Sequence, residues 1–113
     1  MNYSHFIIRV CTKPKSSFCD NEIMYCEFIG KFHQFRNNKY TLCKVSSWGT
    51  LAYDISRYYD KGDYLMVEGY LCSKKSNLDE SDIKTSVEIS AYRVYPYALK
   101  KVDKRIKKQL YLN

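Results

Sequence analysis

The segment "CKVSSWGTLAYDISRYYDKGDYLMVEGYL", residues 43–71, decides the fold class because its hydrophobic period changes twice. It opens with the end of a weakly alternating run over 39–48, which predicts a strand. Leu51 and Ile55 then lie at helical spacing with a tyrosine that follows, which predicts a helix of about three turns. The run over 63–72 alternates again. A helix therefore joins two predicted strands in this part of the chain.

Polar and small residues mark both ends of this helix. Thr50 is expected to cap its first turn, because a threonine hydroxyl can accept a hydrogen bond from a free backbone N–H. Gly62 is expected to end it, since glycine adopts the left-handed conformation that stops a helix. On the strand that follows, Leu65, Val67 and Leu71 share one face, which predicts a buried side.

Three further segments predict strands: 5–10 ("HFIIRV"), 22–35 and 83–95. "TKPKSS", which follows the first of them, reads as a break because Pro14 has no N–H for a ladder. Three strands, one helix and two strands form the order of an oligonucleotide/oligosaccharide-binding (OB) barrel, and other small α+β folds share this order. A closed barrel is favoured because it leaves no sheet edge exposed. The predicted fold class is all-β: a five-stranded antiparallel OB barrel with one helix between strands three and four.

Side-chain alternation on the third predicted strand separates a core face from an outward face. Cys43 and Val45 are the apolar pair expected in the core, which leaves Lys44 and Trp48 on the outside. A cation and a large aromatic on one outward stripe suit a stacked, phosphate-bearing strand. Trp48 is equally compatible with packing beneath the helix that it precedes, and the pattern alone leaves both interpretations open.

The positive charge of the chain is concentrated at its carboxyl end. The 113 residues fit one domain, and the formal net charge is +7. Residues 98–113, "ALKKVDKRIKKQLYLN", hold six basic residues against one acidic residue. We therefore divide the chain into an OB domain, 1–97, and a basic tail, 98–113, with a helical pattern of apolar residues. A solvated extension, a nucleic-acid contact and a membrane or partner surface remain open for this tail.

The five cysteines and two histidines form no recognisable site. The cysteine number is odd and no CxxC occurs, so the thiols are expected to act as small hydrophobes in a reducing compartment. His5 and His33 lie on different predicted strands, and no nucleotide-binding or nucleophile motif occurs. We therefore expect no enzyme, metal, cofactor or small-molecule substrate. With no long apolar run, we also expect no membrane span.

A barrel that is rich in basic and aromatic residues is typical of a single-stranded nucleic-acid binder. Aromatic residues make up 16% of the chain, and 12 of them are tyrosines. Aromatic faces stack on bases of any sequence while cations follow the phosphates.

Several segments together resemble the bacterial-type single-stranded DNA-binding protein family. "FIIRVCTKP", 6–14, is similar to the family's first strand and the turn after it. Residues 43–71 resemble its most characteristic block, through aromatic-Gly-x-Leu-Ala at 48–52, Lys-Gly at 61–62, and Val-Glu-Gly-x-Leu at 67–71. "VEISAYRV", residues 87–94, is similar to its last strand.

This resemblance implies an OB-fold that assembles as a homo-oligomer, a dimer or tetramer, and binds single-stranded DNA without sequence preference in replication, repair and recombination. The family's stacking aromatic falls on Trp48 and its basic position on Lys44. Its other aromatic on that strand falls on Leu42, for which Tyr40 is a substitute. RNA remains a possible partner. The full candidate set for nucleic-acid binding is Trp48, Lys44, Phe35, Tyr40, Arg9, Arg36, Lys74, Lys75 and Tyr70.

Three departures from the family leave a second function open. A stacking aromatic expected near Ser76 is absent, and Lys74 and Lys75 are expected to hold the backbone there instead. The body outside the tail is close to neutral, and the family's acidic recruiting tip is missing. The alternative is an OB-fold assembly or scaffold subunit with a degenerate nucleic-acid face. An outward stripe of Tyr64, Met66 and Tyr70 suits either the pairing of barrels or the stacking of bases.

The composition also points to a source. Residues with AT-rich codons are abundant, and the amino terminus lacks the features of a signal or transit peptide. Similar short members of the family are encoded by some algal plastid genomes. We therefore expect a plastid protein if the gene is organellar, and otherwise a bacterial cytoplasmic one.

Overall fold

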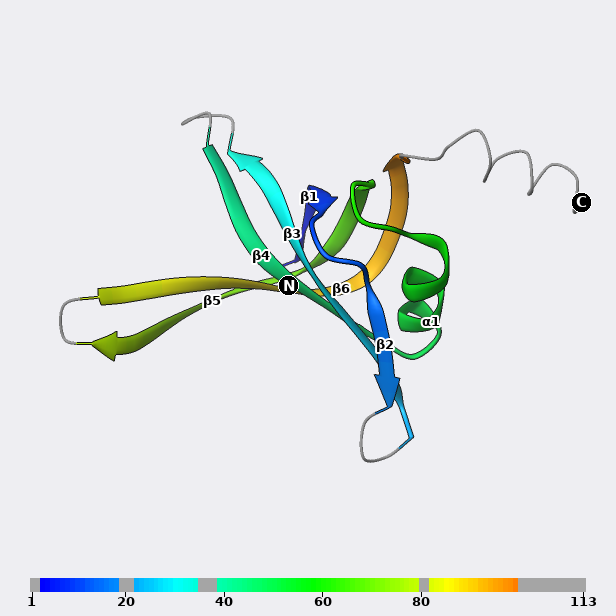
Figure 1. The fold of residues 1–113 in the computed structure, drawn as a ribbon, viewed down its shortest axis with the longest axis horizontal. Helices are drawn as coiled ribbons and strands as arrows, with labels where there is room; N and C mark the ends of the chain where they lie inside the picture. Colours follow the sequence, from blue (N-terminus) through cyan, green and yellow to red (C-terminus); the bar gives the residue numbers. More distant parts are fainter. Residues whose placement is uncertain (1–2, 19–21, 35–38, 80–81, 100–113) are drawn as a thin grey trace, which may run out of the picture.

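The computed structural model describes residues 3–18, 22–34, 39–79 and 82–99, with the backbone alone described at 3, 33–34, 73–79 and 82–86. Its elements follow the chain in the order shown in Figure 1: β1 (Tyr3–Val10), β2 (Lys15–Phe18), β3 (Met24–Gln34), β4 (Lys39–Trp48), α1 (Gly49–Tyr58), β5 (Tyr64–Asp79) and β6 (Asp82–Ala98).

Five of these strands close into a barrel in the order β1-β5-β6-β4-β3, and a second pairing of β1 with β3 completes the ring. This closing pairing is short and matches Ile8, Arg9 and Val10 with residues 30–32 of β3. The predicted OB barrel with one helix between its third and fourth strands is therefore confirmed.

Two details of the prediction are wrong. The barrel is not wholly antiparallel, because β4 and β6 run parallel over residues 43–46 and 87–90. The described chain also holds a sixth strand, β2, which pairs outside the ring with the first residues of β3. Pro14 is buried directly before β2, so its missing N–H removes no bond from the ladder.

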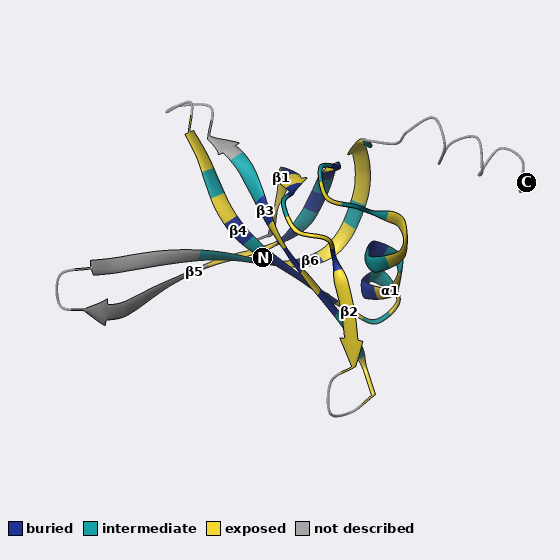
Figure 2. Ribbon diagram, viewed as in Figure 1, coloured by how far each residue is buried: buried dark blue, intermediate teal, exposed yellow. Residues whose placement is uncertain are grey.

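Alternation along each barrel strand places the core as predicted. Ile8 and Val10 of β1 and Cys43 and Val45 of β4 are all buried, whereas Ile7 and Leu42 beside them are exposed. Figure 2 shows buried and exposed residues in turn along the barrel strands. Burial raises the pKa of the Cys43 thiol to about 12, so this side chain is a neutral apolar group at physiological pH. The described core comprises Ile8, Val10, Cys26, Phe28, Cys43, Val45, Ala52, Ile55, Leu65, Val67, Ile89 and Ala91.

Helix α1 packs Ala52 and Ile55 into this core. Its N-terminal flanking residue is Trp48, in an extended conformation with no side-chain cap, so the prediction that Thr50 caps the helix is wrong. Strand β4 runs directly into the helix, which places Thr50 already inside the first turn. Gly62 does adopt a positive φ of 96°, but in the turn after the helix, where its N–H donates to the carbonyl oxygen of Val10 at 2.8 Å.

Strands β5 and β6 continue together beyond the barrel as a two-stranded arm (Figure 1). Leu71, which was expected in the core, lies at the start of this arm and is exposed. Its prediction was wrong because no other described element covers that face of the arm. At its other end, β6 runs to Ala98, and Leu99 packs against the core.

Gly69 lies where β5 and β6 change register, and it leaves no room for a side chain. A Cβ at this position would overlap the carbonyl oxygen of Ser90 and lie 3.0 Å from the Cα of Ala91. Both obstacles are backbone atoms of the partner strand, so no side-chain rotation relieves them.

Gly69→Ala is therefore expected to lower the free energy of unfolding by about 1–3 kcal/mol, the usual cost of overpacking. Urea unfolding followed by circular dichroism at a fixed protein concentration measures this difference. Ser16→Ala, on the exposed strand β2, is the control and should stay within about 0.5 kcal/mol of the unsubstituted chain. Equal stability of the two variants would contradict this account of the β5–β6 contact.

Candidate nucleic-acid interface

The outward faces of β3 and β4 bring together three of the nine predicted site residues, Trp48, Lys44 and Tyr40. Residues that lie opposite each other on neighbouring antiparallel strands have Cβ atoms about 5 Å apart, so each matched pair is in contact. The outward pairs along this ladder are Tyr25 with Trp48, Glu27 with Ser46, Ile29 with Lys44, and Lys31 with Leu42.

Trp48 lies on the outer surface at the end of β4 and does not pack beneath the helix. Its side chain is 47% exposed. The ring of Tyr25 supports it from β3, with centroids 5.4 Å apart and planes tilted by 55°. Tilted aromatic pairs of this kind are stabilising and hold both rings in place. One aromatic surface is thus held rigidly while part of it stays open to solvent.

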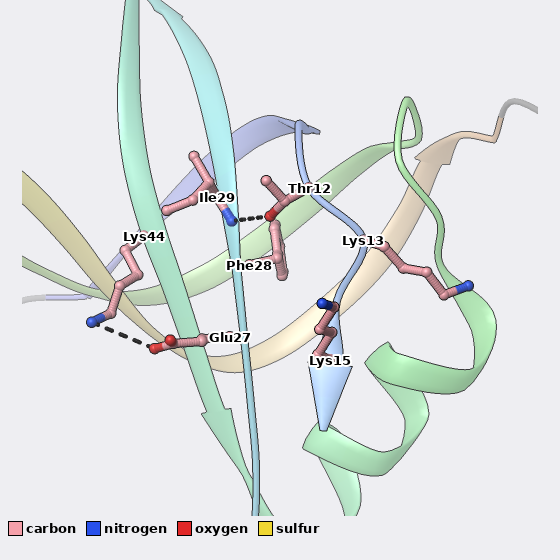
Figure 3. A pocket seen from close by; sticks show the side chains of 7 residues that line it. All are labelled: Thr12, Lys13, Lys15, Glu27, Phe28, Ile29 and Lys44. Carbon is pink, nitrogen blue, oxygen red and sulfur yellow. Dashed lines mark hydrogen bonds and ion pairs between the residues drawn. The ribbon is translucent and has the colours of Figure 1, made fainter. Parts of the chain in front are cut away.

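Lys44 lies on the same face, but carboxylates surround it. Its Nζ is 3.4 Å from Glu27 Oε2 and 3.7 Å from Glu88 Oε1 (Figure 3 shows the first pair). Glu27 also accepts a hydrogen bond from the Tyr25 hydroxyl. The cation predicted to hold a phosphate is therefore already neutralised by two strands of its own barrel.

These contacts shift the pKa values of the groups involved. The hydrogen bond from Tyr25, and after it the charge of Lys44, lowers the pKa of Glu27 from its ordinary value. The charge of Glu27 in turn raises the pKa of Lys44. The pair consequently stays ionised, and Lys44 stays neutralised, until the pH falls through the lowered pKa of Glu27.

A shallow hollow of about 250 Å³ opens beside this pair, between β2, β3 and β4. Lys13, Lys15 and Lys44 line it together with Glu27, as Figure 3 shows. Lys13 is held at 2.8 Å by Asp60 at its far edge. Three lysines and one carboxylate thus line the hollow, and ion pairs with Glu27 and Asp60 engage two of the lysines, Lys44 and Lys13.

The opposite end of β4 has a different character. Tyr40 is 64% exposed, and Lys31 lies over its ring with Nζ 4.8 Å from the centroid. Leu42 is also exposed, so an apolar side chain occupies the position of the family's second aromatic. Arg9, on β1, lies over the ring of Tyr64 at 6.0 Å. Sequence reasoning missed Lys31, although its parity with Glu27 on β3 places it on the outward face.

The remaining predicted residues lie on β5 or outside the described residues. Tyr70 of β5 lies in one row with Ser90 and Ser46, and its ring is 6.3 Å from that of Tyr92. It therefore lies two strands away from the β4 face. Lys74 and Lys75 lie along the arm, where the structure describes the backbone alone, whereas Phe35, Arg36 and the tail from 100 onward are outside the described residues.

The described residues offer neither a membrane-spanning helix nor a metal-binding cluster. In that part of the chain, no helix has the length and apolar character required to cross a membrane. Within the same residues, no three His, Cys, Asp or Glu side chains gather in a way that suits a metal ion.

Tyr25→Phe tests the network around Glu27, because it removes the hydroxyl and keeps the ring beside Trp48. The pKa of Glu27 is expected to rise, since its largest stabilising contact is lost. Lys44→Gln is also expected to raise this pKa, because the charge and the hydrogen bond of Lys44 both lower it. Carboxyl chemical shifts of Glu27, followed by NMR through an acid titration, measure both changes. An unchanged or lower pKa of Glu27 in Tyr25→Phe would contradict the contribution of the Tyr25 hydroxyl.

Comparison with known proteins supports the same fold and family. The ycf41 protein of Trieres chinensis, provisionally named a single-stranded DNA-binding protein, is 42% identical over 107 residues, which are 91% of this chain and 95% of the relative. A thylakoid-associated single-stranded DNA-binding protein of Synechocystis is 32% identical over 97 residues, 83% of this chain and 74% of the relative.

Among solved structures, the SSB domain of a Synechococcus protein superposes with a TM-score of 0.66 over 84% of this chain and 94% of that chain. At 19% identity this likeness supports the fold alone. The single-strand binding protein family itself matches residues 1–97, which confirms the resemblance read from the sequence. The chain therefore belongs to the single-strand binding protein family.

Proposed function

We propose that this protein binds single-stranded DNA without preference for sequence, on the outward face of β3 and β4. The observation that carries the proposal is Trp48, a partly exposed indole held against the Tyr25 ring on the binding face of an OB barrel. Membership of the single-strand binding protein family supports it, as do the names of the two relatives.

On this face the rings provide most of the attraction for bases. Trp48 stacks on one base, and Tyr25 fixes the angle of the indole through its tilted contact. Stacking contributes roughly 1–3 kcal/mol per base and accepts any base, because every base has a π-face. The exposed ring of Tyr40 offers a second stacking surface at the far end of β4, where Leu42 cannot stack.

The biological setting follows from the family and the relatives. We assign binding rather than catalysis to this protein. Its ligand is the single-stranded DNA exposed during DNA replication, repair or recombination. A plastid location is supported by the likeness to the ycf41 protein and by the abundance of residues with AT-rich codons. We also propose that residues 1–97 form the binding domain, that the basic tail, 98–113, adds phosphate contacts, and that the protein forms a homo-oligomer. Sedimentation equilibrium determines the oligomeric state.

A second candidate function is that of an assembly subunit whose nucleic-acid face has degenerated. Lys44 favours it, because Glu27 and Glu88 neutralise the cation at the centre of the face. Retention on single-stranded DNA resin at physiological salt discriminates the two functions. If retention disappears when residues 98–113 are removed, the barrel face is not the main site. A parallel column of single-stranded RNA determines whether RNA binds as well.

Binding of oligo(dT) is expected to quench the fluorescence of Trp48, and added salt is expected to reverse the quenching. Trp48→Ala is expected to weaken binding roughly 5- to 150-fold, the equivalent of one lost stacking contact. Fluorescence anisotropy of a labelled oligo(dT) measures the affinity of the variant, which has no tryptophan.

Tyr53→Ala is the matched control, because Tyr53 is an equally exposed aromatic on helix α1. It should leave the affinity within about twofold, since a residue that contacts no base contributes no stacking. The proposed function fails if oligo(dT) leaves the Trp48 fluorescence unchanged, or if the two alanine variants bind equally well.

A further inference from the structure

Two cations lie directly opposite each other where the barrel closes. Arg9 of β1 is matched in register with Lys31 of β3, and both point outward beside the buried closing residues. Like charges directly opposite on neighbouring strands repel and destabilise the sheet. The pair is therefore an unfavourable feature of the free protein, and an anion bound between the two side chains would relieve it.

No carboxylate offsets this pair within the described residues. The ion pairs found there join His5 with Glu68, Lys13 with Asp60, and Lys44 with its two glutamates. Arg9 and Lys31 take part in none of these. Lys44 holds the position where the family places its cation. Unlike the charges of Arg9 and Lys31, the charge of Lys44 is compensated by nearby carboxylates.

Aromatic rings hold both of these cations from the sides. Arg9 lies over Tyr64 at 6.0 Å, and Lys31 lies over Tyr40 at 4.8 Å. The register places Tyr64, Arg9, Lys31 and Leu42 in one continuous row across β5, β1, β3 and β4. A cation over a ring keeps most of its charge available on the side away from the ring. The row thus combines positive charge with exposed π-faces, as a nucleic-acid strand requires.

We propose that Arg9 and Lys31 together bind the backbone phosphates of single-stranded DNA, flanked by Tyr64 and Tyr40, and that Lys44 does not serve this purpose. This proposal rests on the proposed function and adds the path that the single-stranded DNA takes across the barrel. Leu42 and Trp48 are six residues apart on β4, which is about 20 Å. The DNA strand is therefore held by stacking at Trp48 and by charge at the row, with the ion-paired Lys44 cluster between them.

The test compares the double variant Arg9→Gln/Lys31→Gln with the full chain, using labelled oligo(dT) over a series of salt concentrations. Each phosphate contact on a single strand contributes about 0.7 to the slope of log affinity against log salt. The double variant is expected to lower the steepness of this slope by about 1.4 and to weaken binding roughly tenfold at low salt.

Arg57→Gln is the first control, because Arg57 also lies over two tyrosines but on helix α1, away from the row. Lys44→Gln is the second control and removes a cation that carboxylates already neutralise. Both are expected to leave the salt slope within about 0.3 of the full chain, since neither releases counterions by a phosphate contact. Urea unfolding checks that all variants remain folded.

The outcomes separate this proposal from the proposed function. One outcome is that the full chain binds oligo(dT), Trp48→Ala weakens binding, and the double variant keeps the original salt slope. In that case Arg9 and Lys31 do not bind phosphates, while the proposed function stands. A larger loss of slope in Lys44→Gln than in the double variant also overturns the row. If the full chain does not bind oligo(dT), the proposed function itself is wrong.

Discussion

The closing pairing between β1 and β3 is the constraint on which the rest of this structure depends. Three residues of β1 pair with β3 while the strand also pairs with β5 along most of its length. This double role turns an open sheet into a barrel and leaves no unpaired edge at the join. It holds Val10 opposite Gly30, where a Cβ would overlap the side chain of Ile8. Strands β1 and β3 approach this closely because residue 30 is glycine.

Closure also fixes what the outer surface offers to a ligand. Strand β1 contributes Arg9 to a surface that β3 and β4 alone would not form, and the register then sets Arg9 beside Lys31. Along the same face, Glu27 and Glu88 reach Lys44 from the strands on either side of β4. The result is a face with a neutral centre, an aromatic pair at one end and positive charge at the other.

The alternation of residues predicted much of this arrangement. Burial of Cys43 and Val45 and the outward direction of Lys44 and Trp48 follow from a period of two, which any regular strand must obey. Leu71 shows where that reasoning ends. Its position in the alternation predicts an inward side chain, but β5 has left the barrel at that point and Leu71 is exposed. Alternation gives the face on which a side chain lies and does not show whether other elements cover that face.

Local periodicity and short motifs predicted the order of the barrel strands and the helix, most inward and outward faces, and the family. They did not predict β2, which lies in a segment read as a break, or which charges meet. Lys44 is 17 residues from Glu27 and 44 from Glu88, and Arg9 is 22 from Lys31. Such pairs depend on strand register, which the chain settles only when the barrel closes. Alternation alone left Trp48 either outside the barrel or beneath the helix, and the family resemblance favoured the outside. Its exposure and its contact with Tyr25 across the β3–β4 ladder place it outside.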